Sequence, residues 1–368
     1  MSGKVSIITL HYVKNYGSVL QTYATQTVFE RLGYKAEFVD YVRPNERVVE
    51  HKKSFKEKAV ELGKRAVLKA TKGESFDKED HIFKDFVEQY IHLSGHYNSY
   101  EELSANPPQA DVYCTGSDQM WNCEWNGGII PAYYLEFAPE GRPRISYAAS
   151  IGMKEIPQKY KEQVQEMTAK YSAISVRENS AVEVLKTINY PDAVQVLDPT
   201  FMLRPSEWEK IMAERPVPYE YVLIYQLNPN EEFDQFARDL AKEKGIKTLR
   251  VAFSLKEAMM KDKTIYFPTV AQWLSLFYHA SYVVTDSFHG TAFSINLQKQ
   301  VFVFYPPRFK TRLDSILSLT GLEDRIAEGR HPGEMKEITT YDKVQEILNK
   351  ERGKAEEFLK GALGNEGV

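Results

Sequence analysis

The stretch Tyr282–Thr291, with the sequence YVVTDSFHGT, is typical of a strand that ends in a tight turn and continues as a helix. An acid, a hydroxyl and an imidazole follow the strand within four residues, at the place where open α/β sheets bind their ligands. Gly290 allows a close approach of backbone or ligand, because it carries no side chain. The free amides at the start of the helix, beside Gly290 and Thr291, favour an anion. We therefore predict that this corner handles a small phosphorylated acid.

The composition narrows the class of protein. A chain of 368 residues suits two domains, and 43% apolar residues exclude extended disorder. A net charge of −4 argues against nucleic acid as the main partner. Two cysteines, Cys114 and Cys123, make no disulfide framework, which favours a reducing compartment. Without an apolar run of about 18 residues or a signal-peptide pattern, we expect a cytoplasmic protein.

The first 40 residues have the pattern of a βαβ unit. Lys4–Leu10 predicts a buried strand, residues 19–32 a helix and Ala36–Asp40 a second strand, so the sheet should be parallel and doubly wound. The loop between them contains one glycine, Gly17, whereas a dinucleotide fingerprint needs three. Gly17 either meets a turn requirement or contacts a ligand, and its neighbours Asn15 and Tyr16 leave both interpretations open.

Residues 50–95 depart from this rhythm and predict a helical insertion. Its basic side chains, from Lys52 to Lys72, decorate a helical pattern with an apolar face. Such a helix can lie on the anionic inner face of a membrane. The alternative is an inserted helical pair with a solvated basic surface.

Two further corners carry polar residues at strand ends. In the segment from Gly116 to Asn122, Ser117 and Asp118 can cap the next turn of the chain, and Trp121 can stack on a ring; an Asx-type turn is the alternative. Arg177 ends a short strand, where its guanidinium can hold a carboxylate or phosphate, or pair with Glu178 or another acid.

The second half repeats the strand and helix alternation from residue 221 onward. Asp198-Pro199 favours an extended boundary, so we predict domains at 1–199 and 200–368, the second ending in an amphipathic helix over 342–364. After the strand at 301–305, three cations either neutralise a phosphate or are solvated: Arg308, Lys310 and Arg312. No Cys/His cluster has the spacing of a metal site, so neither a metal nor a cofactor is expected.

Six motifs occur in the order found in one family. They are the Asn15-Tyr16-Gly17 loop, the segment from Gly116 to Asn122, the segment from Tyr147 to Gly152, the segment from Ser175 to Glu178, the segment from Leu197 to Thr200, and the segment from Ser287 to Gly290. Over nearly its whole length the chain resembles the polysaccharide pyruvyl transferases. The resemblance implies an α/β fold of two Rossmann-like domains with parallel sheets facing a cleft, as in GT-B glycosyltransferases. It also implies transfer of the pyruvyl group of phosphoenolpyruvate to two hydroxyls of a sugar, free or lipid-linked, as a ketal.

The resemblance suggests roles for individual residues. His289 is the family histidine and would act as general acid or phosphate partner, with Asp286 orienting it or acting as base. The donor would be held by Arg177, Ser287, Gly290, Thr291, Arg308, Lys310 and Arg312. The acceptor would be held by Asn15, Tyr16, Gly17, Ser117, Asp118, Trp121 and Asn122.

One position departs from the family pattern. Many members carry an arginine two residues before the histidine, where this chain has Ser287. This loss of charge favours one alternative to pyruvyl transfer, a glycan-binding or assembly protein that has lost the donor site. A second alternative is a glycosyltransferase of the same architecture that uses a nucleotide sugar, because fold alone does not set function.

Overall fold

The structure is a computed structural model that describes residues 3–41, 63, 66, 78–260 and 262–364. The basic stretch from Lys52 to Lys72 falls almost wholly outside these residues, so its predicted membrane contact is not addressed by the fold. Within the described part of the chain, no helix is both long and apolar enough to cross a membrane.

The first half of the chain forms a seven-stranded sheet in which every neighbouring pair is parallel. The strand order is β3-β2-β1-β4-β5-β6-β7. The central strands carry almost only buried residues because helices cover both faces, as the apolar runs predict. The strands are β1 (Lys4–Ile8), β2 (Lys35–Tyr41), β3 (Leu93–Tyr97), β4 (Val112–Thr115), β5 (Arg144–Ala149), β6 (Ala173–Val176) and β7 (Val194–Gln195).

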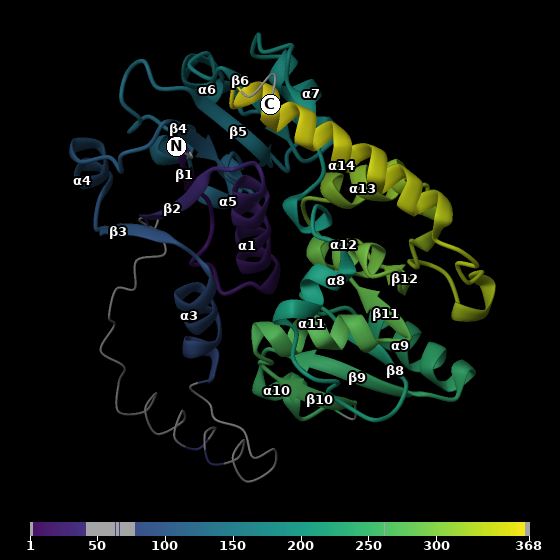
Figure 1. The fold of residues 1–368 in the computed structure, drawn as a ribbon. Helices are drawn as coiled ribbons and strands as arrows, with labels where there is room; N and C mark the ends of the chain where they lie inside the picture. Colours follow the sequence, from purple (N-terminus) through teal and green to yellow (C-terminus); the bar gives the residue numbers. More distant parts are fainter. Residues whose placement is uncertain (1–2, 42–62, 64–65, 67–77, 261, 365–368) are drawn as a thin grey trace.

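The second half forms a five-stranded parallel sheet in the order β10-β9-β8-β11-β12. This order equals that of the first five strands of the other sheet, so the prediction of two Rossmann-like domains with parallel sheets is confirmed (Figure 1). The strands are β8 (Tyr221–Tyr225), β9 (Lys247–Ala252), β10 (Lys263–Tyr266), β11 (Tyr282–Thr285) and β12 (Gln300–Val303).

Helices connect the strands and cover the sheets. The N-terminal half contains α1 (Tyr16–Arg31), α3 (Lys78–Tyr90), α4 (Tyr100–Ala105), α5 (Cys123–Asn126), α6 (Lys161–Thr168) and α7 (Asn179–Lys186). The segment between the sheets contains a 3₁₀ turn, Pro199–Phe201, and α8 (Pro205–Trp208). The C-terminal half contains α9 (Glu231–Lys244), α10 (Leu255–Ala258), α11 (Val270–His279), α12 (Phe288–Asn296), α13 (Thr311–Thr320) and α14 (Asp342–Ala362).

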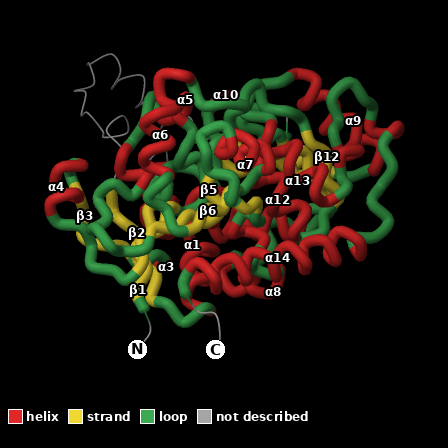
Figure 2. The backbone as a smooth tube through the Cα atoms, turned by 90° about the horizontal axis from the view of Figure 1, so that it is seen from above, coloured by secondary structure: helices red, strands yellow, loops and turns green. Residues whose placement is uncertain are grey.

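The last helix, α14, returns from the C-terminal domain to the N-terminal one. It packs on α13, and beyond its end the carbonyl of Leu363 accepts a hydrogen bond from the Tyr34 hydroxyl at 3.0 Å. Both views place the end of α14 on the side of the first sheet (Figures 1 and 2). The predicted C-terminal helix therefore connects the two domains a second time.

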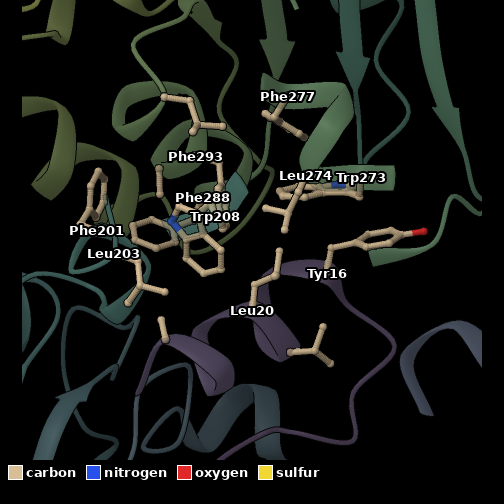
Figure 3. Packing of buried hydrophobic residues seen from close by; sticks show 14 of the residues in the cluster. Tyr16, Leu20, Phe201, Leu203, Trp208, Trp273, Leu274, Phe277, Phe288 and Phe293 are labelled. Atoms are coloured by element: carbon tan, nitrogen blue, oxygen red, sulfur yellow. The ribbon is translucent and has the colours of Figure 1, made fainter. Parts of the chain in front are cut away.

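The two domains share one apolar core where α1 meets α11. The rings of Tyr16 and Trp273 stack with centroids 5.5 Å apart, and the Tyr16 hydroxyl donates to the carbonyl of Pro268 at 2.5 Å. Figure 3 shows Tyr16 and Leu20 facing Trp273 and Leu274 across the boundary, with Trp208 of α8 close by. This packing holds the strand ends of the two sheets opposite each other.

Candidate functional site

The corner between β11 and α12 is built by hydrogen bonds within the turn. The Ser287 hydroxyl accepts from the Gly290 amide at 3.2 Å and so caps α12, while the Thr291 hydroxyl donates back to the carbonyl of Ser287 at 3.0 Å. A Cβ at Gly290 would lie 2.4 Å from the Thr285 hydroxyl oxygen, so this position requires glycine. The structure therefore gives Ser287, Gly290 and Thr291 a part in forming the corner, and Ser287 alone of the three lines the adjoining cavity.

His289 projects from this corner onto the first turn of α1. A Cβ on Gly17 would lie 2.0 Å from Cγ of His289, so the imidazole occupies the space that a side chain would take. Gly17 lies within α1 and outside the cavity wall, so neither a turn requirement nor a ligand contact describes it; its lack of a side chain makes room for the imidazole. His289 Nε2 lies 3.7 Å from Oδ2 of Asp198 and is buried without a hydrogen-bond partner.

Asp286 does not take the orienting position that was expected of it. Its carboxylate accepts from the amides of Leu227 (2.7 Å) and Asn228 (2.9 Å) and from the Asn228 side chain (2.8 Å). Burial raises the pKa of Asp286, although these three donors oppose the rise. Asp286 thus positions the loop after β8, and the carboxylate that faces His289 belongs to Asp198 at the end of β7.

Arg177 is buried, with 4% of its surface exposed, and it pairs with acids of its own domain. Its Nη1 donates to Oδ2 of Asp198 at 2.8 Å, and Nη2 lies 3.6 Å from Oδ1 of Asp118. Its guanidinium also lies over the Phe288 ring, 4.4 Å from the centroid. Arg177 does not line the cavity beside His289 and pairs with Asp118 and Asp198, although its Nε and Nη2 have no hydrogen-bond partner; its contact with a donor stays a prediction.

The electrostatics follow from this arrangement. Burial alone would raise the pKa of Asp198, but His289 and Arg177 lower it well below its usual range. Asp118 behaves in the same way: burial opposes ionisation, and Arg177 and His289 outweigh it, so its pKa is lowered. Asp118 also accepts a hydrogen bond of 2.6 Å from the Ser18 hydroxyl in the first turn of α1. Both carboxylates are therefore anionic at neutral pH.

The three predicted cations after β12 have different surroundings. Arg308 is exposed and donates to Glu124 at 3.0 Å, whereas the exposed Lys310 lies over the Tyr305 ring and outside the cavity beside His289. Arg312 lines that cavity, and its Nε is buried without a hydrogen-bond partner. Burial, and then the nearby Arg177, lower the pKa of Arg312 to about 10, so the guanidinium stays charged at neutral pH. Arg312 and Arg308 thus both line the cavity, and Arg312 is the one whose Nε lacks a hydrogen-bond partner.

The cavity itself lies between the domains and has a volume of about 360 Å³. A volume of this size accepts a small molecule. Both domains contribute to its wall, which includes Asn15, Ser18, Asp118, Gln119, Trp125, Asn228, Asp286, Ser287, His289, Arg308, Phe309 and Arg312.

The residues expected to hold the acceptor separate into two groups. Asn15, which caps α1, and Asp118 line the cavity. Trp121 is instead buried in the core, stacked on Tyr134 at 5.5 Å, so its predicted stacking on a ligand is wrong. Three others are also buried in structural contacts: Tyr16 between the domains, Ser117 donating to Asp198 and Asn122 capping α5.

Several wall residues are absent from the set predicted from the sequence. Gln119 lies within the segment from Gly116 to Asn122, and Trp125 lies four residues after Trp121. Asn228 follows the end of β8, and its signal is that position, because ligands bind at strand ends. Among the described residues, no group of His, Cys, Asp and Glu is arranged to hold a metal ion.

The sequence profile of the family described as "Polysaccharide pyruvyl transferase" matches residues 15–307. The chain belongs to this family. In this member of the pyruvyl transferase family, the matched range includes every residue named above in the cavity wall except Arg308, Phe309 and Arg312. A comparison with curated proteins finds no match.

Solved structures with a similar chain course include two epimerases and a glycosyltransferase. A UDP-N-acetylglucosamine 2-epimerase from Rickettsia bellii has 11% identity and a TM-score of 0.49, with 100% of this chain and 97% of that chain covered. A putative UDP-N-acetylglucosamine 2-epimerase from Listeria monocytogenes has 10% identity and a TM-score of 0.49, with 97% of this chain and 91% of that chain covered. UGT89C1 of Arabidopsis thaliana, complexed with UDP-L-rhamnose, has 12% identity and a TM-score of 0.46, with 99% of this chain and 94% of that chain covered. Because these TM-scores are below 0.5, the fold assignment rests on the strand orders.

Proposed function

We propose that the protein transfers the pyruvyl group of phosphoenolpyruvate to two hydroxyls of a sugar in a cell-surface polysaccharide precursor. The observation that supports this most is Arg312, a partly exposed residue that lines the same cavity as His289 and whose buried Nε has no hydrogen-bond partner. A small anion that enters the cavity satisfies the guanidinium, because a charge-assisted hydrogen bond replaces an unmet one. In this proposal Arg312 supplies the charge that Ser287 lacks.

The reaction needs a proton at the methylene carbon of phosphoenolpyruvate. Protonation makes the neighbouring carbon oxocarbenium-like, and a sugar hydroxyl attacks it and loses its proton. Phosphate then leaves, and a second hydroxyl closes the ketal. The atoms balance as phosphoenolpyruvate plus a diol giving a ketal plus phosphate.

His289 would give the proton or hold the phosphate, and Asp198 would act as its positioning residue. A carboxylate that faces Nε2 fixes the orientation of the imidazole. Asp118, ionised and at the cavity wall, would accept a hydroxyl proton, and Asp286 at the same wall is the alternative acceptor. No metal or cofactor enters this scheme. We expect the reaction in the cytoplasm, where phosphoenolpyruvate is made, on an acceptor that is free or lipid-linked.

The test is thermal unfolding with and without phosphoenolpyruvate. A ligand that binds only the folded protein adds about 2.7 kcal/mol at 100 times its dissociation constant, which raises Tm visibly. We expect this rise in the wild type and in Lys310→Met, which removes an exposed cation outside the cavity, and its loss in Arg312→Met. Stabilisation by a UDP-sugar, with none by phosphoenolpyruvate, would instead indicate a glycosyltransferase.

A further inference from the structure

A second cavity, of about 300 Å³, lies between the domains beside the one that contains His289. The two cavities share Asn15 and Leu227, so they adjoin. The remaining wall comes largely from the ends of β8, β9 and β10, which is the ligand-binding edge of a parallel sheet. At this shared rim Leu227 is 43% exposed, an unusual position for a large apolar side chain in a cleft.

The wall of the second cavity is aromatic, with a few polar groups. Phe253 is partly exposed, and the rings of Tyr225 and Phe267 pack edge-on against it with centroids 5.9 Å and 5.6 Å away. Edge-on neighbours fix the orientation of the Phe253 ring. Glu257 accepts from the Phe253 amide at 2.7 Å, and its carboxylate has further acceptor capacity. Gln226, which also lines the cavity, is fixed by a bond of 2.7 Å from Arg250.

This chemistry differs from that of the first cavity. The first presents His289, Arg308 and Arg312 and suits an anion, whereas the second presents aromatic carbon, the carboxylate of Glu257 and one cation, Lys14. With one charge of each sign, the second cavity lacks the excess of cations that the several negative charges of phosphoenolpyruvate require. A pyranose ring has an apolar face of C–H groups and a rim of hydroxyl donors, which match a fixed aromatic ring beside carboxylate and amide acceptors.

We propose that the second cavity binds a non-reacting sugar of the acceptor, next to the sugar that receives the pyruvyl group. The substrate class is then an oligosaccharide of at least two units rather than a monosaccharide. This inference rests on the proposed pyruvyl transfer, which puts the reacting sugar beside His289. It also accounts for the burial of Ser117, Trp121 and Asn122, which leaves the expected acceptor site without several of its side chains.

A third cavity offers a matched control. It has a volume of about 490 Å³, shares Pro307, Arg308 and Phe309 with the first, and shares no wall residue with the second. Its wall is mainly charged and includes the exposed Lys154 and Glu155. An acceptor that extended this way would contact Lys154 and leave Phe253 untouched.

The experiment is saturation-transfer NMR on the full chain with phosphoenolpyruvate present. The probes are lactose, cellobiose and diacetylchitobiose, each beside the methyl glycosides of its two sugars. We expect at least one disaccharide to receive saturation on both rings and to bind more tightly than its monosaccharides. Phe253→Leu keeps apolar bulk and removes the ring, so it should abolish the signal of one ring and weaken binding about tenfold, equal to 1.4 kcal/mol. Lys154→Ala should change neither.

Other outcomes overturn the proposal. Saturation of one ring only, equal effects of Phe253→Leu and Lys154→Ala, or no sugar signal at all would each exclude a sugar site here. Glu257→Gln, which removes a charge from a partly exposed residue, repeats the test if Phe253→Leu does not fold. Thermal stabilisation by phosphoenolpyruvate, measured on the same samples, separates the two proposals. If it is absent while both rings still depend on Phe253, the sugar site stands and pyruvyl transfer fails.

Discussion

At the scale of single residues, the imidazole of His289 occupies the volume that a side chain at Gly17 would need. Alanine is a better helix former than glycine, so Gly17→Ala would favour α1 if space allowed. A Cβ there would lie 2.0 Å from the imidazole, however, so His289 must move. We expect a kcat/KM for ketal formation at least about tenfold lower, which equals about 1.4 kcal/mol in the barrier.

The control for this substitution is Gly353→Ala. Gly353 also lies in a helix, and a Cβ there would meet no atom within 4 Å. Activity should be unchanged, and the free energy of unfolding should rise by about 0.5–1 kcal/mol because alanine favours the helix. Equal activities of Gly17→Ala and the wild type would show that the position of His289 does not matter.

A substitution of Asp198 tests how much its pairing with Arg177 stabilises the fold. Asp198→Asn removes the charge that compensates Arg177, so we expect a loss of about 3–5 kcal/mol in the free energy of unfolding at neutral pH. The pKa of Asp198 is lower in the folded protein than in the unfolded chain, where an aspartate has a pKa near 3.9. The ionised carboxylate therefore stabilises the fold fully at pH values above about 3.9, and this stabilisation is lost as the pH falls below that value. The variant should therefore lose less stability on acidification.

Urea unfolding at neutral pH and below about pH 4 measures both effects. The control is Asp192→Asn, an exposed acid between α7 and β7, which should change the free energy of unfolding by less than about 0.5 kcal/mol. If Asp198→Asn unfolds at the wild-type urea concentration, the pairing of Asp198 with Arg177 does not stabilise the fold.

At the scale of elements, α14 is hydrogen-bonded to two segments that carry residues of the site. Arg352 donates to the carbonyl of Phe201 at 2.7 Å and to the Asn296 side chain at 3.0 Å, which joins α14 to the turn after Asp198 and to the end of α12. Arg352→Met keeps the apolar stem and removes these bonds. We expect the free energy of unfolding to fall by about 1.5–3 kcal/mol, measured by urea unfolding.

Lys354→Met, on the exposed face of the same helix, is its matched control and should stay within about 0.5 kcal/mol of the wild type. A similar loss of unfolding free energy in both variants would mean that the two hydrogen bonds of Arg352 do not stabilise the fold more than a surface side chain of the same helix does.

The elements were largely predictable, while the site was predictable only in part. The strand at Tyr282–Thr285 and its following helix agree with the structure because apolar runs and helical spacing are local properties. The side-chain direction of Trp121 and the approach of Asp198 to His289 depend on contacts between distant parts of the chain. A strand end followed by Asp-Pro-Thr was visible, but nothing local shows which histidine the acid would face.

At the scale of the whole molecule, Tyr16 decides how firmly the domains are held together. Tyr16→Phe should cost about 1 kcal/mol, since it removes the hydrogen bond to Pro268 and keeps the stacking on Trp273. Tyr16→Ala should cost about 3–5 kcal/mol, because it leaves a void in the shared core. Urea unfolding measures both, and X-ray scattering should show a larger radius of gyration for Tyr16→Ala alone. An unchanged radius would mean that the remaining contacts suffice.

The return of α14 has a mechanical consequence. Two domains joined by one covalent segment can swing in any direction, whereas a second attachment at α14 leaves mainly rotation about the line through both crossings. The cavities lie between the strand ends of the two sheets, where such a rotation changes the gap. A rotation about this axis would therefore separate the imidazole on one domain from the carboxylates on the other, so these groups would act together only when the two domains are closed on each other.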